Sequence, residues 1–250
     1  MDLRQRVCMI TGGTSGIGAA TAMALVKRGA HVAVVARTFR GETLESLKTL
    51  ASAEDSEFLF VQGDLGNADD CRRSVDVVCS VLGHVDVLVH AAGHPFQGGL
   101  FDISDGEWLR AFDTHVHSSF WLSRAVAPHM IRQKSGAILL IGSAAGLRGC
   151  AGAIAYGVAK GALPQFARAL ARELANDNIR VNCVSPGIIR TPFQDMLTPE
   201  QVETNISSRI PLHREGQPED VAHAIVCLLE NEFVTGENFV IDGGMSMRMV

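Results

Sequence analysis

Short apolar runs alternate with longer amphipathic stretches along the chain, and this alternation limits the fold more than any other feature. Seven runs are predicted to be strands: 7–11, 31–36, 57–62, 86–90, 137–142, 180–184 and 238–241. Strands that are apolar almost throughout are typical of parallel sheets covered on both faces. We therefore expect an α/β protein, one domain over residues 1–250, with a doubly wound parallel sheet and helices on both faces.

The stretches between the runs carry recognisable helix ends. Ser104 and Glu107 have the spacing of a capping box and begin a long helix predicted over 104–132. Pro199 follows a threonine cap and occupies the first position of a later helix. A second long helix is predicted over 155–176. No repeat, linker or low-complexity segment divides the chain, which supports one domain.

Charge and cysteine content limit the partners and the compartment. The net charge is -5 without a long run of one sign, which argues against binding to nucleic acid or to an anionic membrane. The six cysteines are scattered without C-x-x-C spacing, as expected of reduced and mostly buried thiols. The first strand begins by Val7, which leaves no room for a signal peptide, and no run is long enough to span a bilayer. We expect a soluble cytoplasmic protein.

Tyr156 and Lys160 are the first candidates for chemistry. They stand four residues apart, so a helix places both side chains on one face. An ammonium beside a phenol favours the phenolate, which predicts a tyrosine pKa lowered from about 10. Ser143 follows the apolar run 137–141, so its hydroxyl can bond a substrate oxygen at a strand end. Taken alone, the tyrosine and the lysine are also typical of an ordinary surface helix.

A glycine-rich turn, T-G-G-T-S-G-I-G at residues 11–18, lies between the first strand and the first helix. Glycines at this position let the backbone close on a pyrophosphate, which the N-terminus of the helix then binds. A tight structural turn is the alternative, but the position within an alternating chain favours a dinucleotide site and hence a Rossmann fold.

The end of the second strand indicates which dinucleotide binds. Arg37 and Arg40 follow this strand, where enzymes that read a free ribose 2′-hydroxyl usually carry an acid. A guanidinium can grip a 2′-phosphate through two parallel bonds. We expect NADP(H) as the preferred cofactor and NAD(H) as the alternative, unless both arginines are solvated surface charges.

Together these motifs resemble those of the classical short-chain dehydrogenase/reductase family over essentially the whole chain. The T-G-x-x-x-G-x-G motif of the family is residues 11–18, and its catalytic residues are Ser143, Tyr156 and Lys160. Residues 182–187 resemble the loop on the nicotinamide side, and 234–244 resemble the closing strand. The resemblance implies an NAD(P)(H)-dependent oxidoreductase that transfers a hydride between nicotinamide and a ketone or secondary alcohol.

The resemblance also implies which residues bind the cofactor. Asp64 would approach the adenine ring (a solvated loop acid is the alternative), Thr191 would approach the carboxamide, and Lys160 would bond the nicotinamide ribose. The expected set is Gly12, Thr14, Ser15, Gly16, Ile17, Gly18, Arg37, Asp64, Leu65, Ala92, Gly93, Tyr156, Lys160, Pro186, Gly187, Ile189 and Thr191.

Two histidines depart from the family pattern. His90 begins H-A-A-G where the family has N-N-A-G, and His115 stands where the family has a fourth catalytic residue, an asparagine that holds a relay water. A neutral imidazole donates and accepts hydrogen bonds and titrates near neutrality. His115 is therefore a fourth catalytic candidate, with simple space filling as the alternative. The spacing of the histidines makes a metal site improbable.

The sequence says less about the substrate. We expect its pocket to be bounded by His94, Phe96, Ala145, Leu147 and Cys150, and by a lid over about 190–215 that includes Phe193, Met196, Leu197 and Ile206. Arg148 and Arg190 could meet an acidic substrate or be solvated charges. The family resemblance suggests a 3-oxoacyl, sugar or polyol substrate and a homo-oligomer, either a tetramer or a dimer. A cofactor-binding sensor or scaffold with little turnover is the alternative function.

Overall fold

A computed structural model describes residues 1–194 and 197–247 and contains one parallel sheet of seven strands. The order across the sheet is β3-β2-β1-β4-β5-β6-β7, so the chain winds first one way and then the other from β1. This confirms the predicted doubly wound sheet. The strands are β1 Val7–Thr11, β2 His31–Ala36, β3 Phe58–Gln62, β4 Val87–His90, β5 Gly136–Ile141, β6 Ile179–Pro186 and β7 Asn238–Ile241.

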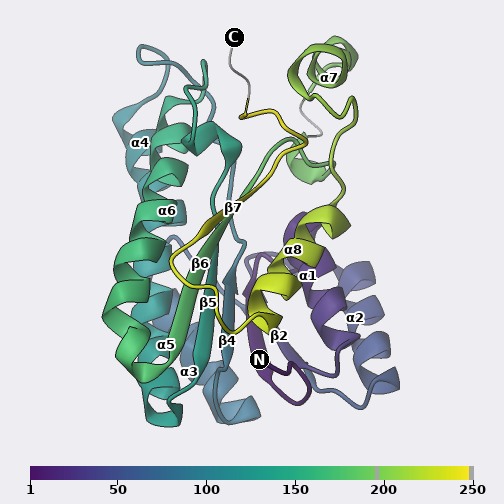
Figure 1. Cartoon of the computed structure of the whole chain (residues 1–250), viewed down its shortest axis with the longest axis vertical. Coiled ribbons are helices and arrows are strands. Elements are labelled where there is room, and N and C mark those ends of the chain that lie inside the picture. Colours follow the sequence, from purple (N-terminus) through teal and green to yellow (C-terminus); the bar gives the residue numbers. More distant parts are fainter. Residues whose placement is uncertain (195–196, 248–250) are drawn as a thin grey trace.

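Helices cover both faces of the sheet (Figure 1). One layer, on the right of the view, holds α1 (Gly16–Val26), α2 (Gly41–Ala53) and α8 (Pro218–Glu230). The other holds α3 (Ala68–Leu82), α4 (Asp105–Phe112), α5 (Ser118–Gln133) and α6 (Ile154–Leu174). The short helix α7 (Pro199–Thr204) stands apart from both layers at the top right.

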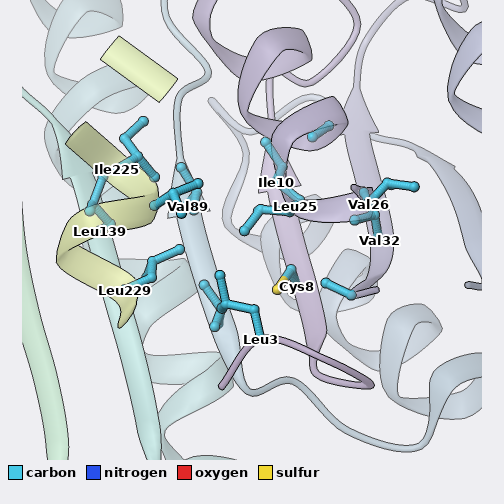
Figure 2. Packing of buried hydrophobic residues seen from close by; sticks show 14 of the residues in the cluster. Leu3, Cys8, Ile10, Leu25, Val26, Val32, Val89, Leu139, Ile225 and Leu229 are labelled. Carbon is cyan, nitrogen blue, oxygen red and sulfur yellow. The ribbon is translucent and has the colours of Figure 1, made fainter. Parts of the chain in front are cut away.

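The core consists of two clusters, one on each side of the sheet. Alternate residues of β1 enter opposite clusters: Cys8 and Ile10 face α1, whereas Val7 and Met9 face the layer of α5. Figure 2 shows the first cluster, in which side chains from β1, α1 and α8 pack together. Burial on both faces explains why the strands read as continuous apolar runs.

The boundaries differ from the predicted ones by one or two residues at several strands. β3 and β4 each begin one residue late, β5 covers Gly136–Ile141 rather than 137–142, and β6 extends over Ile179–Pro186. The predicted helix over 104–132 runs from Asp105 to Gln133, but a π-helical turn, η1, replaces its α-helical pattern at Asp113–His117. The second long helix ends at Leu174, and 3₁₀ turn η3 (Ala175–Asp177) follows.

All six cysteines are free thiols, but only Cys8, Cys71 and Cys183 are buried, while Cys227 is exposed. The prediction of mostly buried thiols is therefore correct for only half of the cysteines. Among the described residues, no helix combines the length and apolarity needed to cross a bilayer.

Candidate functional site

A cleft of about 1260 Å³ opens where the parallel strands end at their carboxyl termini. Every residue predicted from the sequence to be catalytic or to bind the cofactor lines this cleft. They are Gly12, Thr14, Ser15, Gly16, Ile17, Gly18, Arg37, Asp64, Leu65, Ala92, Gly93, His115, Ser143, Tyr156, Lys160, Pro186, Gly187, Ile189 and Thr191. The sheet thus brings together segments that lie far apart in the chain.

The glycine-rich turn has the close geometry that a nucleotide site requires. Gly12 has a φ of 69°, and a Cβ atom there would lie 2.8 Å from the backbone of Ala92. A Cβ at Gly18 would lie 2.3 Å from the carbonyl oxygen of Gly12, so the start of α1 packs directly on the turn. Ser15 caps α1 without a side-chain hydrogen bond, and Gly16, Ile17 and Gly18 line the cleft. The first N–H groups of α1 are therefore suited to binding a pyrophosphate.

Arg37 and Arg40 line the cleft beside this turn, both with exposed side chains. Neither forms an ion pair within the part of the chain that the structure describes. Asp64 also lines the cleft, and its Oδ1 accepts the Gly66 N–H at 3.1 Å, which orients the carboxylate. The adenine end thus combines two unpaired guanidinium groups with one fixed acid.

A tight contact joins α6 to the loop after β5. A Cβ at Gly146 would lie 2.5 Å from the Gly161 nitrogen, so these two backbones touch. The buried Lys160 ammonium donates to the Ile141 carbonyl at the end of β5, at 2.7 Å. Burial lowers the pKa of Lys160 to about 8. These contacts fix the position of Tyr156, one helical turn before Lys160.

The predicted lowering of the Tyr156 pKa is wrong for the protein alone. Lys160 does lie on the same face of α6, with its Nζ 5.8 Å from the centre of the Tyr156 ring. Burial, however, raises the pKa of Tyr156 above its ordinary value, and the neighbouring Cys150 adds to this, while a hydrogen bond with Ser143 acts in the opposite direction. The phenol therefore keeps its proton at neutral pH.

Ser143 lies directly in front of the 3₁₀ turn η2 (Ala144–Gly146), two residues after β5 ends. Its Oγ accepts the Ala145 N–H at 3.1 Å. Because that bond uses an acceptor position, the Ser143 hydroxyl can still donate its proton, to the Tyr156 oxygen in the protein alone or to a substrate oxygen in the cleft.

His115 sits within the π-helical turn η1 and is 1% exposed. Its Nε2 donates to the His94 carbonyl at 3.0 Å, which assigns the proton to Nε2, and its Nδ1 has no hydrogen-bond partner among the described residues. The ring packs edge-on against Tyr156, with 5.4 Å between the ring centres. Burial, and secondarily the charge of Lys160, holds the pKa of His115 well below its usual value. The expectation that His115 titrates near neutrality is therefore wrong.

His90 links the nucleotide turn to the π-helical turn through a buried chain of hydrogen bonds. Thr11 and His90 are paired in register on β1 and β4, and Thr11 Oγ1 lies 2.7 Å from His90 Nδ1. His90 Nε2 lies 2.8 Å from Ser118 Oγ, which in turn donates to the Thr114 carbonyl at 2.7 Å. Since the Ser118 proton is used there, Nε2 must donate and Nδ1 must accept the Thr11 proton. Burial lowers the pKa of His90 to about 3, so the ring is neutral.

The structure sorts the remaining pocket candidates. His94, Phe96, Ala145, Arg148, Cys150 and Phe193 line the cleft, whereas Leu147, Arg190, Leu197 and Ile206 do not. Met196 lies outside the described residues. Sequence reasoning missed Gln97, Glu107 and Arg110, which also line it, and did not single out Arg209 within the predicted lid. They sit in helices and loops whose motifs carry no cleft signal. Among described residues, no group of three or more potential metal ligands is present.

Comparison with known proteins assigns the family. The family profile described as Enoyl-(Acyl carrier protein) reductase matches residues 12–246. A 3-oxoacyl-[acyl-carrier-protein] reductase from Bos taurus is 37% identical over 244 residues, which cover 98% of this chain and 99% of that protein. This chain belongs to the short-chain dehydrogenase/reductase family.

Solved structures of this family superpose along the whole chain. A short-chain dehydrogenase/reductase from Mycobacterium ulcerans has a TM-score of 0.93 and 30% identity, covering 99% of this chain and 92% of that one. The L-sorbose reductase of Gluconobacter frateurii, solved with NADPH and L-sorbose, has a TM-score of 0.90 and 29% identity over 100% of both chains. This short-chain dehydrogenase/reductase is an NAD(P)-dependent oxidoreductase acting on a ketone or secondary alcohol. Because the matched relatives are named as enzymes, the comparison favours a catalytic function over the alternative of a sensor or scaffold.

The His90 chain yields a prediction about stability. Replacing His90 by leucine removes both ring nitrogens and leaves the Thr11 and Ser118 hydroxyls without their buried partner. We expect His90→Leu to lower the free energy of unfolding by about 2–4 kcal/mol, measured by urea denaturation. His90→Asn, which can still donate and accept, should lose less. Equal stability of His90→Leu and the wild type would contradict the assignment.

Proposed function

We propose that Ser143, Tyr156 and Lys160 carry the chemistry of this oxidoreductase in the direction of carbonyl reduction. A bound nicotinamide cofactor would supply the hydride to the carbonyl carbon. Ser143 donates a hydrogen bond to the carbonyl oxygen, which orients the substrate, and keeps its proton. Tyr156 delivers its own proton to the same oxygen as negative charge develops there. The observation that carries this proposal is that Tyr156 hydrogen-bonds Ser143 and has the Lys160 Nζ 5.8 Å from its ring centre, with all three residues lining the cleft.

The raised pKa of Tyr156 suits this role. A phenol whose pKa lies above its ordinary value is protonated at neutral pH, as a proton donor must be. As the phenol loses its proton, the nearby Lys160 ammonium stabilises the phenolate, and a cofactor phosphate and ribose entering the cleft would favour the charged lysine.

His115 is proposed as a positioning residue in the proton path. Its Nδ1, which has no hydrogen-bond partner in the described part of the chain, and the Lys160 ammonium both flank Gly93: a Cβ placed there would lie 3.4 Å from the one and 3.8 Å from the other. An acceptor so near a lysine can orient the lysine or a bridging water. A neutral imidazole would thus do the work of the family asparagine without itself titrating.

NADP(H) is proposed as the preferred cofactor. Arg37 and Arg40 stand at the end of β2 without an acid partner among the described residues, and a 2′-phosphate would provide one. A solved relative, the sorbose reductase, was crystallised with NADPH. NAD(H) remains the alternative, since Arg37 and Arg40 are exposed.

For the substrate, the 3-oxoacyl and sugar reductases among the relatives support a 3-oxoacyl, sugar or polyol class. We propose that residues 1–250 act as one domain, with a lid over about 190–215. The apolar side chain of Phe193 supports a lid over the reacting end, since its ring lies 5.7 Å from the Tyr156 ring.

We further propose a homo-oligomer, a tetramer or a dimer, in the cytoplasm. Two exposed apolar surfaces support self-association: one at β7 and the turn before it, with Phe233, Phe239 and Val240, and one on α5 and α6, with Phe120 and Val158. The free thiols favour a reducing compartment. The net charge of -5 argues against nucleic acid as a partner.

Tyr156→Phe tests the catalytic assignment. The variant keeps the ring and its packing against His115 and Phe193 but lacks the transferable proton. We expect kcat for carbonyl reduction to fall about 10²–10⁴-fold, with cofactor affinity preserved. Steady-state assays with NADPH and a panel of carbonyl compounds, together with fluorescence titration of the cofactor, measure both. Near-normal turnover would refute the role of Tyr156.

The pH profile tests the state of His115. Because the His115 pKa lies well below its ordinary value, reduction should show no acid limb near pH 6.5 from this ring. His115→Leu, which removes the acceptor, should lower kcat about 10-fold, whereas His115→Asn should restore most of it. A limb near pH 6.5 in the wild type that disappears in His115→Asn would overturn the neutral assignment. If kcat is unchanged in His115→Leu, the only role left for His115 is to fill space.

A substitution of Arg37 tests the cofactor preference. Arg37→Gln removes a charge-assisted bond to a 2′-phosphate, so the ratio of kcat/KM for NADPH to that for NADH should fall about 10-fold. Lys48→Gln, a loss of charge at an exposed position on α2, should leave the ratio unchanged. Equal or better kcat/KM with NADH in the wild type would reject NADP(H) as the preferred cofactor.

A further inference from the structure

Two arginines at the substrate end of the cleft have no acidic partner among the residues that the structure describes. Arg148 follows the 3₁₀ turn after Ser143, and its Nε donates to the Ser246 carbonyl at 3.0 Å. Arg209 ends the π-helical turn η5 (Asn205–Arg209), and its Nη1 donates to the buried Asn205 Oδ1 at 2.9 Å. In the described parts of the chain, neither arginine forms an ion pair. Neutral partners therefore hold each side chain in place and leave its charge uncompensated.

The other arginines around the lid are compensated. Arg190 lies 2.8 Å from the buried carboxylate of Glu215, and Arg214 lies 2.9 Å from Asp220. Neither Arg190 nor Arg214 lines the cleft. Of the two arginines singled out from the sequence, Arg190 thus has a structural ion pair, and Arg148 alone is available to a ligand.

Two further charged groups at this end of the cleft largely offset each other. Glu107 accepts hydrogen bonds from the Ser104 hydroxyl and N–H at 2.7 and 3.0 Å, which lower the pKa of Glu107, and the nearby charge of Arg110 lowers this pKa further. The excess positive charge of the substrate end therefore comes from Arg148 and Arg209.

One turn of the chain connects the two unpaired arginines. Ser246, which accepts from Arg148, belongs to the turn after β7. The Gly243 carbonyl of that turn accepts the Leu212 N–H at 3.2 Å, and Gly244 packs on Pro211, two residues after Arg209. Arg148, in the loop after β5, and the segment that follows Arg209 in the lid therefore both contact the turn after β7.

From this arrangement we propose that the substrate is a carbonyl compound bearing an anionic group, which Arg148 and Arg209 bind. The inference rests on the proposed function, because it places the anion beyond the carbonyl that Ser143 and Tyr156 hold. Guanidinium groups bind carboxylates and phosphates with charge-assisted bonds. The anion is either a carboxylate of a small oxo acid or a phosphate of a thioester carrier; both present the same chemistry to the arginines.

Paired substrates with and without the anion test the proposal. Wild type, Arg148→Gln and Arg209→Gln are assayed with NADPH on acetoacetate against methyl acetoacetate, and on acetoacetyl-CoA against the acetoacetyl thioester of N-acetylcysteamine. The wild type should prefer the anionic member of at least one pair. Each variant should lower that preference, as the ratio of kcat/KM within the pair, about 10-fold. The responding pair identifies the source of the anion.

Arg4→Gln is the matched control, because Arg4 is exposed and precedes β1, at the amino ends of the strands and away from the cleft at their carboxyl ends. It should leave both ratios unchanged. Ratios that stay constant in Arg148→Gln and Arg209→Gln, or a wild type without preference in either pair, would overturn the proposal while leaving the reductase function intact.

A binding measurement keeps the test independent of turnover. Calorimetry with acetoacetyl-CoA and acetoacetate on the NADP⁺-loaded protein, where no reduction can occur, should show about 10-fold weaker binding of one of them to each variant. Affinity unaffected by both substitutions would also overturn the proposal. If the wild type reduces none of the four compounds but binds an anion through these arginines, the proposed chemistry fails on this panel and the anion site stands.

Discussion

The contact between α6 and the end of β5 is the constraint on which the site depends. Gly146 lets the loop after β5 touch the backbone of α6, and the buried Lys160 ammonium donates to the Ile141 carbonyl. Ser143 lies between these two points, and Tyr156 stands one helical turn before Lys160. The relative position of the serine and tyrosine hydroxyls is therefore set by backbone packing rather than by the side chains themselves, as a site held within a fraction of an ångström requires.

Two buried histidines extend this rigid frame towards the nucleotide turn. Both are neutral, because burial opposes the charged imidazolium. Both nitrogens of His90 are hydrogen-bonded, which ties β1 to the start of α5, whereas one nitrogen of His115 has no hydrogen-bond partner among the described residues. The same residue type thus supports packing in one place and leaves a hydrogen-bond acceptor beside the lysine in the other.

Charge is distributed unevenly along the cleft. Arginines without an ion-pair partner among the described residues stand at the adenine end and at the substrate end, and the reacting centre between them holds a protonated phenol and a neutral imidazole. Such a pattern can anchor a ligand of negative charge at each end while the chemistry takes place in a poorly solvated centre, where hydrogen bonds to a developing oxyanion are strongest.

The sequence by itself determined the doubly wound sheet and placed the motif residues, from the glycine-rich turn to Thr191, at one cleft. Strand periodicity and the spacing of motifs are local properties, and the carboxyl ends of parallel strands necessarily meet. Only the tertiary structure decided the direction of the Tyr156 pKa, the π-helical turn beneath His115, and the fact that Arg190 pairs with Glu215 while Arg148 and Arg209 face the cleft. Desolvation and ion pairing depend on which groups from distant segments become neighbours, and no local pattern encodes that.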